Sequence, residues 1–154
     1  MGGDFGPRIT VPASLDILRQ HPYLKVVLCG DQKHIQPFLN ADNESFAGRL
    51  SVLHCEQSVA MDEKPGSALR NKRESTMWKA VALVKDGTAQ ACVSAGNTGA
   101  LMAISLFQLG TLSGISRPAI CTRVPTSRGY TYLLDLGANL ECTSRQLYEF
   151  ALMS

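Results

Sequence analysis

Apolar and polar positions alternate along this chain in blocks whose lengths are typical of strands and helices in turn. Apolar runs of strand length, each bounded by turn residues, cover 24–30 and 50–56. Between 77 and 84 the apolar residues recur at helical spacing, and Lys85-Asp86-Gly87 supplies a helix stop. Strands and helices are therefore expected to alternate through the first half of the chain.

The same alternation continues after residue 90. The expected elements are a strand over 91–95, a helix over 98–109, two strands over 119–124 and 131–136, and a helix over 144–153. The two later strands are expected to pair through the turn at 127–129, while Thr143 and Gln146 have the spacing of a capping box. The helix over 98–109 is apolar nearly all round, which places it in an interior or at a subunit interface.

This order of elements favours the α/β class, with helices packed on a mixed, largely parallel sheet. The 154 residues are enough for one domain with its own core, and they show no internal repeat and no linker. We therefore treat residues 1–154 as part of one α/β domain.

The stretch 93–100 carries the clearest functional signal. Gly96 and Gly99 flank Asn97 and Thr98, directly before the expected apolar helix. A glycine turn at a helix start leaves N–H groups free where the helix dipole favours an anion. We expect the backbone of 96–99 and the side chains of Asn97 and Thr98 to donate to phosphate or an oxyanion; the alternative is a plain capped helix.

Two other loops repeat this combination of glycine and polar residues. The first, 1–7, holds Gly3 and Asp4, and the second, 133–139, holds Asp135 and Asn139. Loops at the carboxyl ends of parallel strands converge on one crevice, so the three loops are expected to share a ligand. Because a carboxylate is a poor ligand for phosphate, the two aspartates are assigned to orienting a basic side chain or loop backbone. Ordinary turn formation is the alternative for both.

Composition narrows the function classes. A net charge of +2, with 45% hydrophobic and 18% charged residues, fits a globular protein and gives no support for nucleic-acid binding. No apolar run reaches the roughly 18 residues of a membrane span. Gly30-Asp31 lacks the further glycines of a dinucleotide fingerprint, so no nicotinamide cofactor is expected. The five cysteines lack the close spacing of a zinc site, and we expect buried thiols in a reducing compartment and no metal.

Several long motifs resemble those of one family. The segments 1–7 (MGGDFGP), 94–102 (SAGNTGALM) and 133–139 (LLDLGAN) are similar to signature segments of the PlsX phosphate acyltransferases. The stretches 68–77, 114–119 and 147–153 resemble the same family in order and spacing. The resemblance covers essentially the whole chain.

This resemblance implies an enzyme of phospholipid synthesis that transfers a fatty acyl group from acyl carrier protein to inorganic phosphate. A downstream membrane acyltransferase would then use the acyl phosphate. It further implies a three-layer α/β/α fold similar to the isocitrate and isopropylmalate dehydrogenases, a homodimer, and no cofactor. The expected location is the cytoplasm, with a peripheral position at the inner membrane face as an alternative.

The chemistry fits these residues without a covalent intermediate, since phosphate itself is the nucleophile. Ser94 lacks the nucleophile elbow, and no histidine has a sequence reason to lie beside it. The basic cluster Arg70, Lys72 and Arg73 is expected to contact the acidic carrier or phosphate, with a solvated helix face as the alternative. The expected catalytic residues are Asp4, Asn97, Thr98 and Asp135; the expected binding residues are Gly3, Arg70, Lys72, Ser94, Gly96, Gly99 and Asn139.

The chain departs from the family pattern in two ways. Family members carry a short strand before the first motif and run to roughly twice this length, so the chain is interpreted as an amino-terminal half that lacks part of the crevice. Two alternatives to the acyl-carrier reaction stay open: acyl transfer to phosphate from a coenzyme A thioester, and a non-catalytic fragment that binds an anion.

Overall fold

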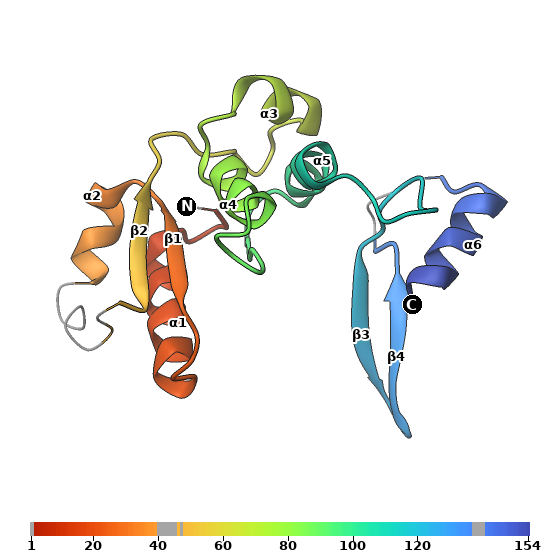
Figure 1. The fold of residues 1–154 in the computed structure, drawn as a ribbon, viewed down its shortest axis with the longest axis horizontal. Helices are drawn as coiled ribbons and strands as arrows, with labels where there is room; N and C mark the ends of the chain where they lie inside the picture. The colour runs from red at the N-terminus through yellow and green to blue at the C-terminus, as the bar shows by residue number, and fades with distance from the viewer. Residues whose placement is uncertain (1, 40–45, 47, 137–140) are drawn as a thin grey trace. The chain divides into compact units, whose positions relative to one another are not determined.

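The computed structural model describes residues 2–39, 46, 48–136 and 141–154. The chain divides into two compact units, residues 1–108 and 109–154. The first unit combines several helices with a two-stranded sheet, and the described part of the second combines one helix with another such sheet (Figure 1).

The first unit is built on a parallel strand pair. Strands β1 (Val26–Gly30) and β2 (Leu50–His54) run in register from Val26 opposite Leu50 to Gly30 opposite His54, so their carboxyl ends lie together. The helices around this pair are α1 (Pro7–Gln20), α2 (Gln32–Ile35) and the 3-10 helix η1 (Gln36–Phe38). Figure 1 shows α1 along one face of the pair and α2 beside its edge.

The start of helix α1 is set by Gly6 and Pro7. Pro7 occupies the first helical position, where no N–H bond is lost, and Gly6 before it has φ +56°. Its buried residues recur at helical spacing and pack against the sheet. This core contains Val11, Leu15, Leu18, Ile35, Leu39 and Phe46, with Val26, Leu28, Leu50 and Val52 packed against it. The resulting layer fixes the positions of the loops at the carboxyl ends of β1 and β2.

Three further helices of the first unit form a second core. They are α3 (Pro65–Asn71), α4 (Thr76–Lys85) and α5 (Thr98–Leu109). The Ser75 hydroxyl caps α4 by accepting a bond from the Trp78 N–H, and Gly87 beyond the helix has φ +80°. The buried residues of this core are Val59, Ala68, Met77, Val81, Ala100 and Ile104.

Where the structure describes it, the second unit consists of a β-hairpin and one helix. Strands β3 (Cys121–Thr126) and β4 (Gly129–Leu134) pair antiparallel, with Thr126 opposite Gly129. Helix α6 (Ser144–Met153) begins with the capping box of Thr143 and Gln146, as the spacing predicts. The carboxylate of Glu149, 2% exposed, accepts bonds from the Ser116 N–H at 2.8 Å and the Ser116 hydroxyl at 2.6 Å. This pair holds the connection before β3 against α6.

The structure confirms the mixed α/β class, and it corrects the predicted sheet. Within the described residues there are two two-stranded sheets, one parallel and one antiparallel, in place of a single mixed sheet. The strand predicted over 91–95 is wrong, because residues 91–94 form no regular element and Val93 is 97% exposed. An apolar run becomes a strand only when another strand supplies backbone partners, and the described residues bring none to it.

Candidate functional site

The loop before α5 is organised by the side chain of Asn97, which is only 8% exposed. Its Oδ1 accepts the Ala100 N–H at 2.9 Å and so caps α5. Its two Nδ2 hydrogens are shared among three backbone carbonyls, those of Ala60 at 3.1 Å, Met61 at 3.0 Å and Glu63 at 2.8 Å. The side-chain amide is therefore fully engaged within the protein.

The expected role of Asn97 as a side-chain donor to phosphate stays a prediction, and these bonds set a cost on it. An anion would have to displace bonds to backbone carbonyls, which are costly to leave unmade when buried. In the structure the Asn97 side chain shapes the loop through these bonds. Gly96 is also engaged, because its N–H donates to the Ser94 hydroxyl at 3.1 Å.

The remaining N–H groups at the start of α5 are open. Those of Asn97, Thr98 and Gly99 have no acceptor within the part of the chain that the structure describes. Thr98 is exposed, and Gly99 lies so close to α3 that a Cβ there would be 2.9 Å from Pro65 Cγ. The start of a 12-residue helix thus presents free donors, which is the property expected of an anion seat.

The amino-terminal loop over 1–7 and the loop over 93–100 lie against each other. A Cβ on Gly2 would be 2.9 Å from the Gly96 Cα, and one on Gly3 would be 3.2 Å from the Ala95 Cβ. Gly3 also has φ +83°, a conformation that favours glycine. The glycines therefore allow the amino-terminal loop to approach the loop before α5 at backbone distance, with exposed Asp4 directly following.

The third predicted loop belongs to the second unit. Asp135 follows β4 with φ +65°, a conformation uncommon for residues other than glycine, and its N–H donates to the Ile120 carbonyl at 2.7 Å. Its Oδ2 accepts from Cys142 Sγ at 3.5 Å. Asn139 lies outside the described residues. That this loop shares a crevice with the other two stays a prediction.

The predicted basic cluster lies between α3 and α4. Arg70 is in the last turn of α3, Lys72 is its C-cap, and Arg73 follows before α4. The guanidinium of Arg73 lies over the rings of Trp78 and Phe107. Whether these cations contact substrate stays a prediction.

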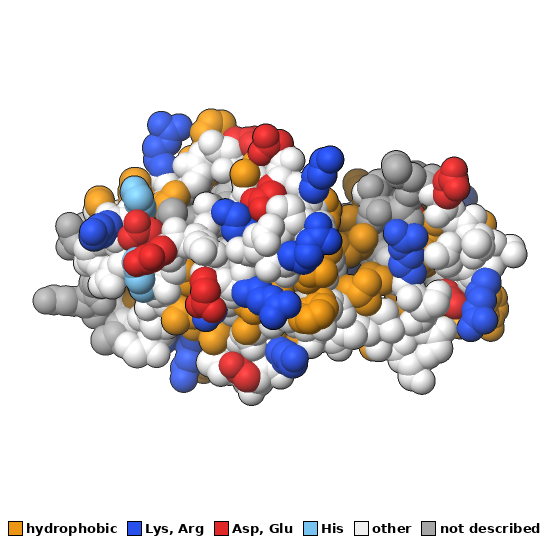
Figure 2. Space-filling model, turned by 90° about the horizontal axis from the view of Figure 1, so that it is seen from above, with side chains coloured by type: hydrophobic (Ala, Val, Ile, Leu, Met, Phe, Trp, Pro, Cys, Tyr) orange, Lys and Arg blue, Asp and Glu red, His pale blue; other side chains and the backbone are white. Residues whose placement is uncertain are grey.

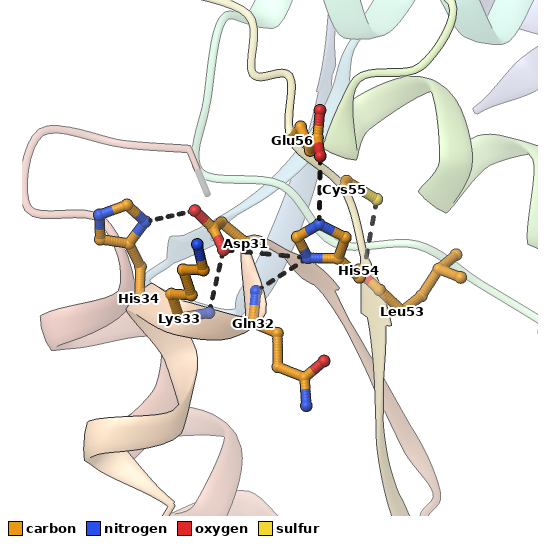
Figure 3. A network of polar contacts seen from close by, with 8 residues as sticks. All are labelled: Asp31, Gln32, Lys33, His34, Leu53, His54, Cys55 and Glu56. Carbon is orange, nitrogen blue, oxygen red and sulfur yellow. Dashed lines mark hydrogen bonds and ion pairs between the residues drawn. The ribbon is translucent and has the colours of Figure 1, made fainter.

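A second polar group, at the carboxyl ends of β1 and β2, was missed by the sequence reasoning (Figure 3). Asp31 accepts the Lys33 N–H at 2.9 Å and lies 2.9 Å from His34 Nδ1, while His54 Nδ1 accepts the Gln32 N–H at 3.1 Å. The bond from Lys33, followed by the two nearby histidines, holds the pKa of Asp31 below its ordinary value of 3.8. The usable signal was the position of Gly30-Asp31 and His54 at paired strand ends.

No disulfide joins the cysteines within the residues that the structure describes. Burial raises the pKa of Cys29 to about 11 and also raises the pKa of Cys55 and Cys92. Cys121, in contrast with the expectation of burial, is exposed. In the described ranges no three His, Cys, Asp or Glu residues are grouped to hold a metal ion. Among the described helices none is both long and apolar enough to cross a bilayer.

The two touching glycine loops, with open donors at the start of α5, define a mixed α/β protein with a candidate anion seat. A family model described as "Fatty acid synthesis protein" matches residues 1–154, the full chain. The chain therefore belongs to this family, the PlsX family of phosphate acyltransferases.

Similar curated proteins carry one name. Proteins named "Phosphate acyltransferase" from Methylococcus capsulatus, Halorhodospira halophila and Hydrogenovibrio crunogenus are 54%, 52% and 55% identical to this chain over 153 residues. Each alignment covers 99% of this chain and 45% of the relative. The chain thus spans about half the length of the curated relatives it matches.

Proposed function

We propose that this protein takes part in transferring a fatty acyl group from acyl carrier protein to inorganic phosphate, which yields acyl phosphate and free carrier. The observation that carries the proposal is an identity above 50%, along 99% of this chain, with proteins named phosphate acyltransferase. Because the relatives are about twice as long as this chain, the reaction is proposed for a protein of their full length. Residues 1–154 would contribute one wall of its site.

In this reaction a phosphate oxygen attacks the carbonyl carbon of the thioester. The C–S bond then breaks, and the thiolate leaves on the carrier. The protein's task is to hold a dianion against the carbonyl and to stabilise the developing oxyanion. The open N–H groups of Thr98 and Gly99 would hold the phosphate, and Asn97 would keep that helix start in place from behind. Arg70 and Lys72 would supply positive charge nearby.

The wider expectations belong to the same proposal. They are a dehydrogenase-like three-layer sheet in the whole protein, a homodimer, a location in the cytoplasm or at the inner membrane face, and a membrane acyltransferase that uses the product. The parallel β1–β2 pair and the helices beside it are compatible with one part of such a sheet.

The experiment measures release of free carrier from acyl-loaded carrier protein by the full-length protein, with and without phosphate, and repeats the assay with an acyl coenzyme A. Phosphate-dependent release from the carrier, with little release from coenzyme A, is the expected result. Preference for coenzyme A would move the protein to the phosphotransacetylase-like alternative. No phosphate-dependent cleavage of either thioester, alongside measurable phosphate binding, would leave the anion-binding fragment as the correct interpretation.

A further inference from the structure

Two histidines share one carboxylate at the carboxyl ends of β1 and β2 (Figure 3). Asp31 Oδ2 lies 2.9 Å from His34 Nδ1, and Asp31 Oδ1 lies 3.8 Å from His54 Nδ1. The side chain of Asp31 is 21% exposed, whereas those of His34 and His54 are 67% and 47% exposed. Figure 2 shows histidine side chains beside acidic ones at the surface. Both imidazoles can therefore exchange protons with solvent.

The two imidazoles carry a hydrogen on different nitrogens. An ionised carboxylate only accepts, so the 2.9 Å contact with Asp31 places a hydrogen on His34 Nδ1. A backbone N–H only donates, so the 3.1 Å bond from Gln32 requires a lone pair on His54 Nδ1. The neutral His54 ring therefore carries its hydrogen on Nε2, which lies 3.9 Å from Glu56 Oε1.

Protonation has opposite consequences for the two rings. At His34 the added proton goes to Nε2, so the bond to Asp31 is kept and becomes charge-assisted. At His54 the proton takes the lone pair of Nδ1, which turns the acceptor of the Gln32 N–H into a donor. The bond between α2 and the end of β2 is then lost, and the new N–H faces Asp31 Oδ1.

The carboxylate oxygen that faces the protonated His54 also caps α2. Asp31 Oδ1 accepts the Lys33 N–H at 2.9 Å. A charged imidazole competes for this oxygen, so protonation of His54 affects the bonds of both the Gln32 and the Lys33 N–H groups. The N–H groups of the next two residues donate to the Asp31 carbonyl at 3.0 and 3.1 Å and are not involved. The change is therefore confined to the first residues of α2.

These residues line an open hollow at the same edge of the sheet. The hollow has a volume of about 650 Å³ and is lined by Gln32, Lys33, Gln36 and His54. The carboxyl ends of parallel strands are where open α/β sheets bind their ligands. A change at the start of α2 therefore alters the shape of a surface with the position of a binding site.

We propose that His54 is a pH-sensitive switch between the end of β2 and the start of α2. Neutral His54 holds the Gln32 N–H, whereas protonated His54 releases it and pairs with Asp31. Of the other charged groups around the ring, Glu56 beyond β2 favours the protonated form, and Lys33, which lines the same hollow, opposes it. This switch does not depend on the proposed function.

The test follows deuterium exchange of the Gln32 amide hydrogen in the full-length protein at about pH 8 and about pH 5, which bracket the usual charge change of histidine. His54→Asn places an amide oxygen where Nδ1 lies, and this oxygen accepts at both pH values. Comparing wild type with His54→Asn at the same pH cancels the intrinsic pH dependence of exchange. The two rates should agree at about pH 8, and the wild-type rate should be about fivefold higher at about pH 5.

Two further variants serve as controls. His34→Asn keeps a donor to Asp31 without a titrating ring and should retain the wild-type response to pH. His54→Phe offers no acceptor, so its Gln32 amide should exchange at the fast rate at both pH values. If His54→Phe exchanges as slowly as His54→Asn, this bond does not protect the Gln32 amide and the switch is wrong.

Two other results would overturn the switch. One is a wild-type rate that equals the His54→Asn rate at both pH values, and the other is loss of the response in His34→Asn, which would make His34 the titrating group. A measurement on wild type alone covers the case in which a variant does not fold. The His54 ring and the Gln32 amide should titrate with the same midpoint in NMR spectra, and separate midpoints would refute the coupling.

Discussion

The side chain of Asn97 joins the start of α5 to the segment that precedes α3. One amide bonds three carbonyls and one N–H, so the conformation of the loop depends on all four bonds together. We therefore expect Asn97 to affect the stability of the fold directly and the binding of a ligand only through the shape of the loop. Substitutions here should therefore be measured by stability before they are interpreted as effects on binding.

We predict that Asn97→Ala lowers the free energy of unfolding by about 1–3 kcal/mol, because it leaves carbonyls unsatisfied and removes the helix cap. Chemical denaturation measures this change. Ser94→Ala, which loses one local bond in an exposed part of the same loop, is the control and should cost far less. Unchanged stability of Asn97→Ala, combined with a raised KM for phosphate, would restore the role of ligand contact.

Glu149 makes the stability of the second unit depend on pH. Bonds from the Ser116 hydroxyl and then the Ser116 N–H, with Arg145, outweigh burial and hold the pKa of Glu149 below its ordinary value of 4.5. A carboxyl with a lowered folded-state pKa stabilises the fold above its unfolded-state pKa, and this contribution is lost as pH falls through the folded-state pKa.

We therefore expect Glu149→Gln to be less stable than wild type at pH 7, with a difference that narrows below about pH 4.5. Thermal unfolding of both proteins between pH 7 and pH 3 measures this difference. Ser116→Ala keeps the backbone donor and should give an intermediate profile. Parallel pH profiles for wild type and Glu149→Gln would show that this carboxylate does not contribute.

At the scale of elements, the decisive contact joins the amino-terminal loop to the loop before α5. Gly2→Ala would place a methyl group 2.9 Å from the Gly96 Cα, a backbone atom that cannot rotate away. We predict a loss of about 1–3 kcal/mol in the free energy of unfolding and a weaker affinity for phosphate.

Gly66→Ala is the matched control for Gly2→Ala. Gly66 lies within α3, and its nearest atom to an added Cβ is an Arg70 nitrogen at 4.0 Å. Alanine favours the helix by up to about 1 kcal/mol, so this variant should be neutral or more stable. Equal effects of the two substitutions in urea denaturation would rule out the loop contact as the cause.

Elements with a local chemical signal were predictable. The helix predicted over 98–109 is confirmed at both ends, since an asparagine cap and Gly110 mark them, and the capping box at Thr143 fixes the start of α6. The hairpin of β3 and β4 is confirmed because its strands are neighbours in sequence. The strand over 91–95 failed for the opposite reason, since only a distant segment could have paired with it.

In the candidate site, too, local sequence signals were predictable and long-range contacts were not. Glycines in 1–7 and 94–100 indicated two loops that allow close approach, and the structure brings them together. The partners of Asn97 lie more than 30 residues away, so no local pattern could show that its amide was already used. The group formed by Asp31 and His54 is also made by residues far apart in the sequence, and its one sequence signal was their position at the ends of two strands.

On the scale of the whole molecule, α5 presents two different faces. Ala100, Ile104 and Gln108 are buried at helical spacing, whereas Leu106, Phe107 and Leu109 are 41%, 58% and 48% exposed. The helix is thus only partly covered, although its sequence is apolar nearly all round. Contiguous exposed apolar area of this kind is commonly covered by another domain or subunit.

We expect residues 1–154 expressed alone to self-associate at micromolar concentration and to lack phosphate-dependent cleavage of the thioester. Sedimentation velocity measures the first and the carrier-release assay the second. Leu109→Glu, which charges the exposed end of α5, should shift the distribution toward monomer. A stable wild-type monomer of 16.6 kDa would contradict the prediction.

The bonds of the Asn97 amide also limit which residues can replace Asn97 during evolution. Aspartate keeps the cap but has no donor when ionised, and serine keeps the cap with a single O–H donor on a shorter side chain. Glutamine places its amide one methylene too far from the carbonyls of Ala60, Met61 and Glu63. Each of these three replacements therefore loses at least one function of the side chain. In a saturation library selected for folded protein, position 97 should retain asparagine almost alone, while exposed Thr98 beside it accepts many residues.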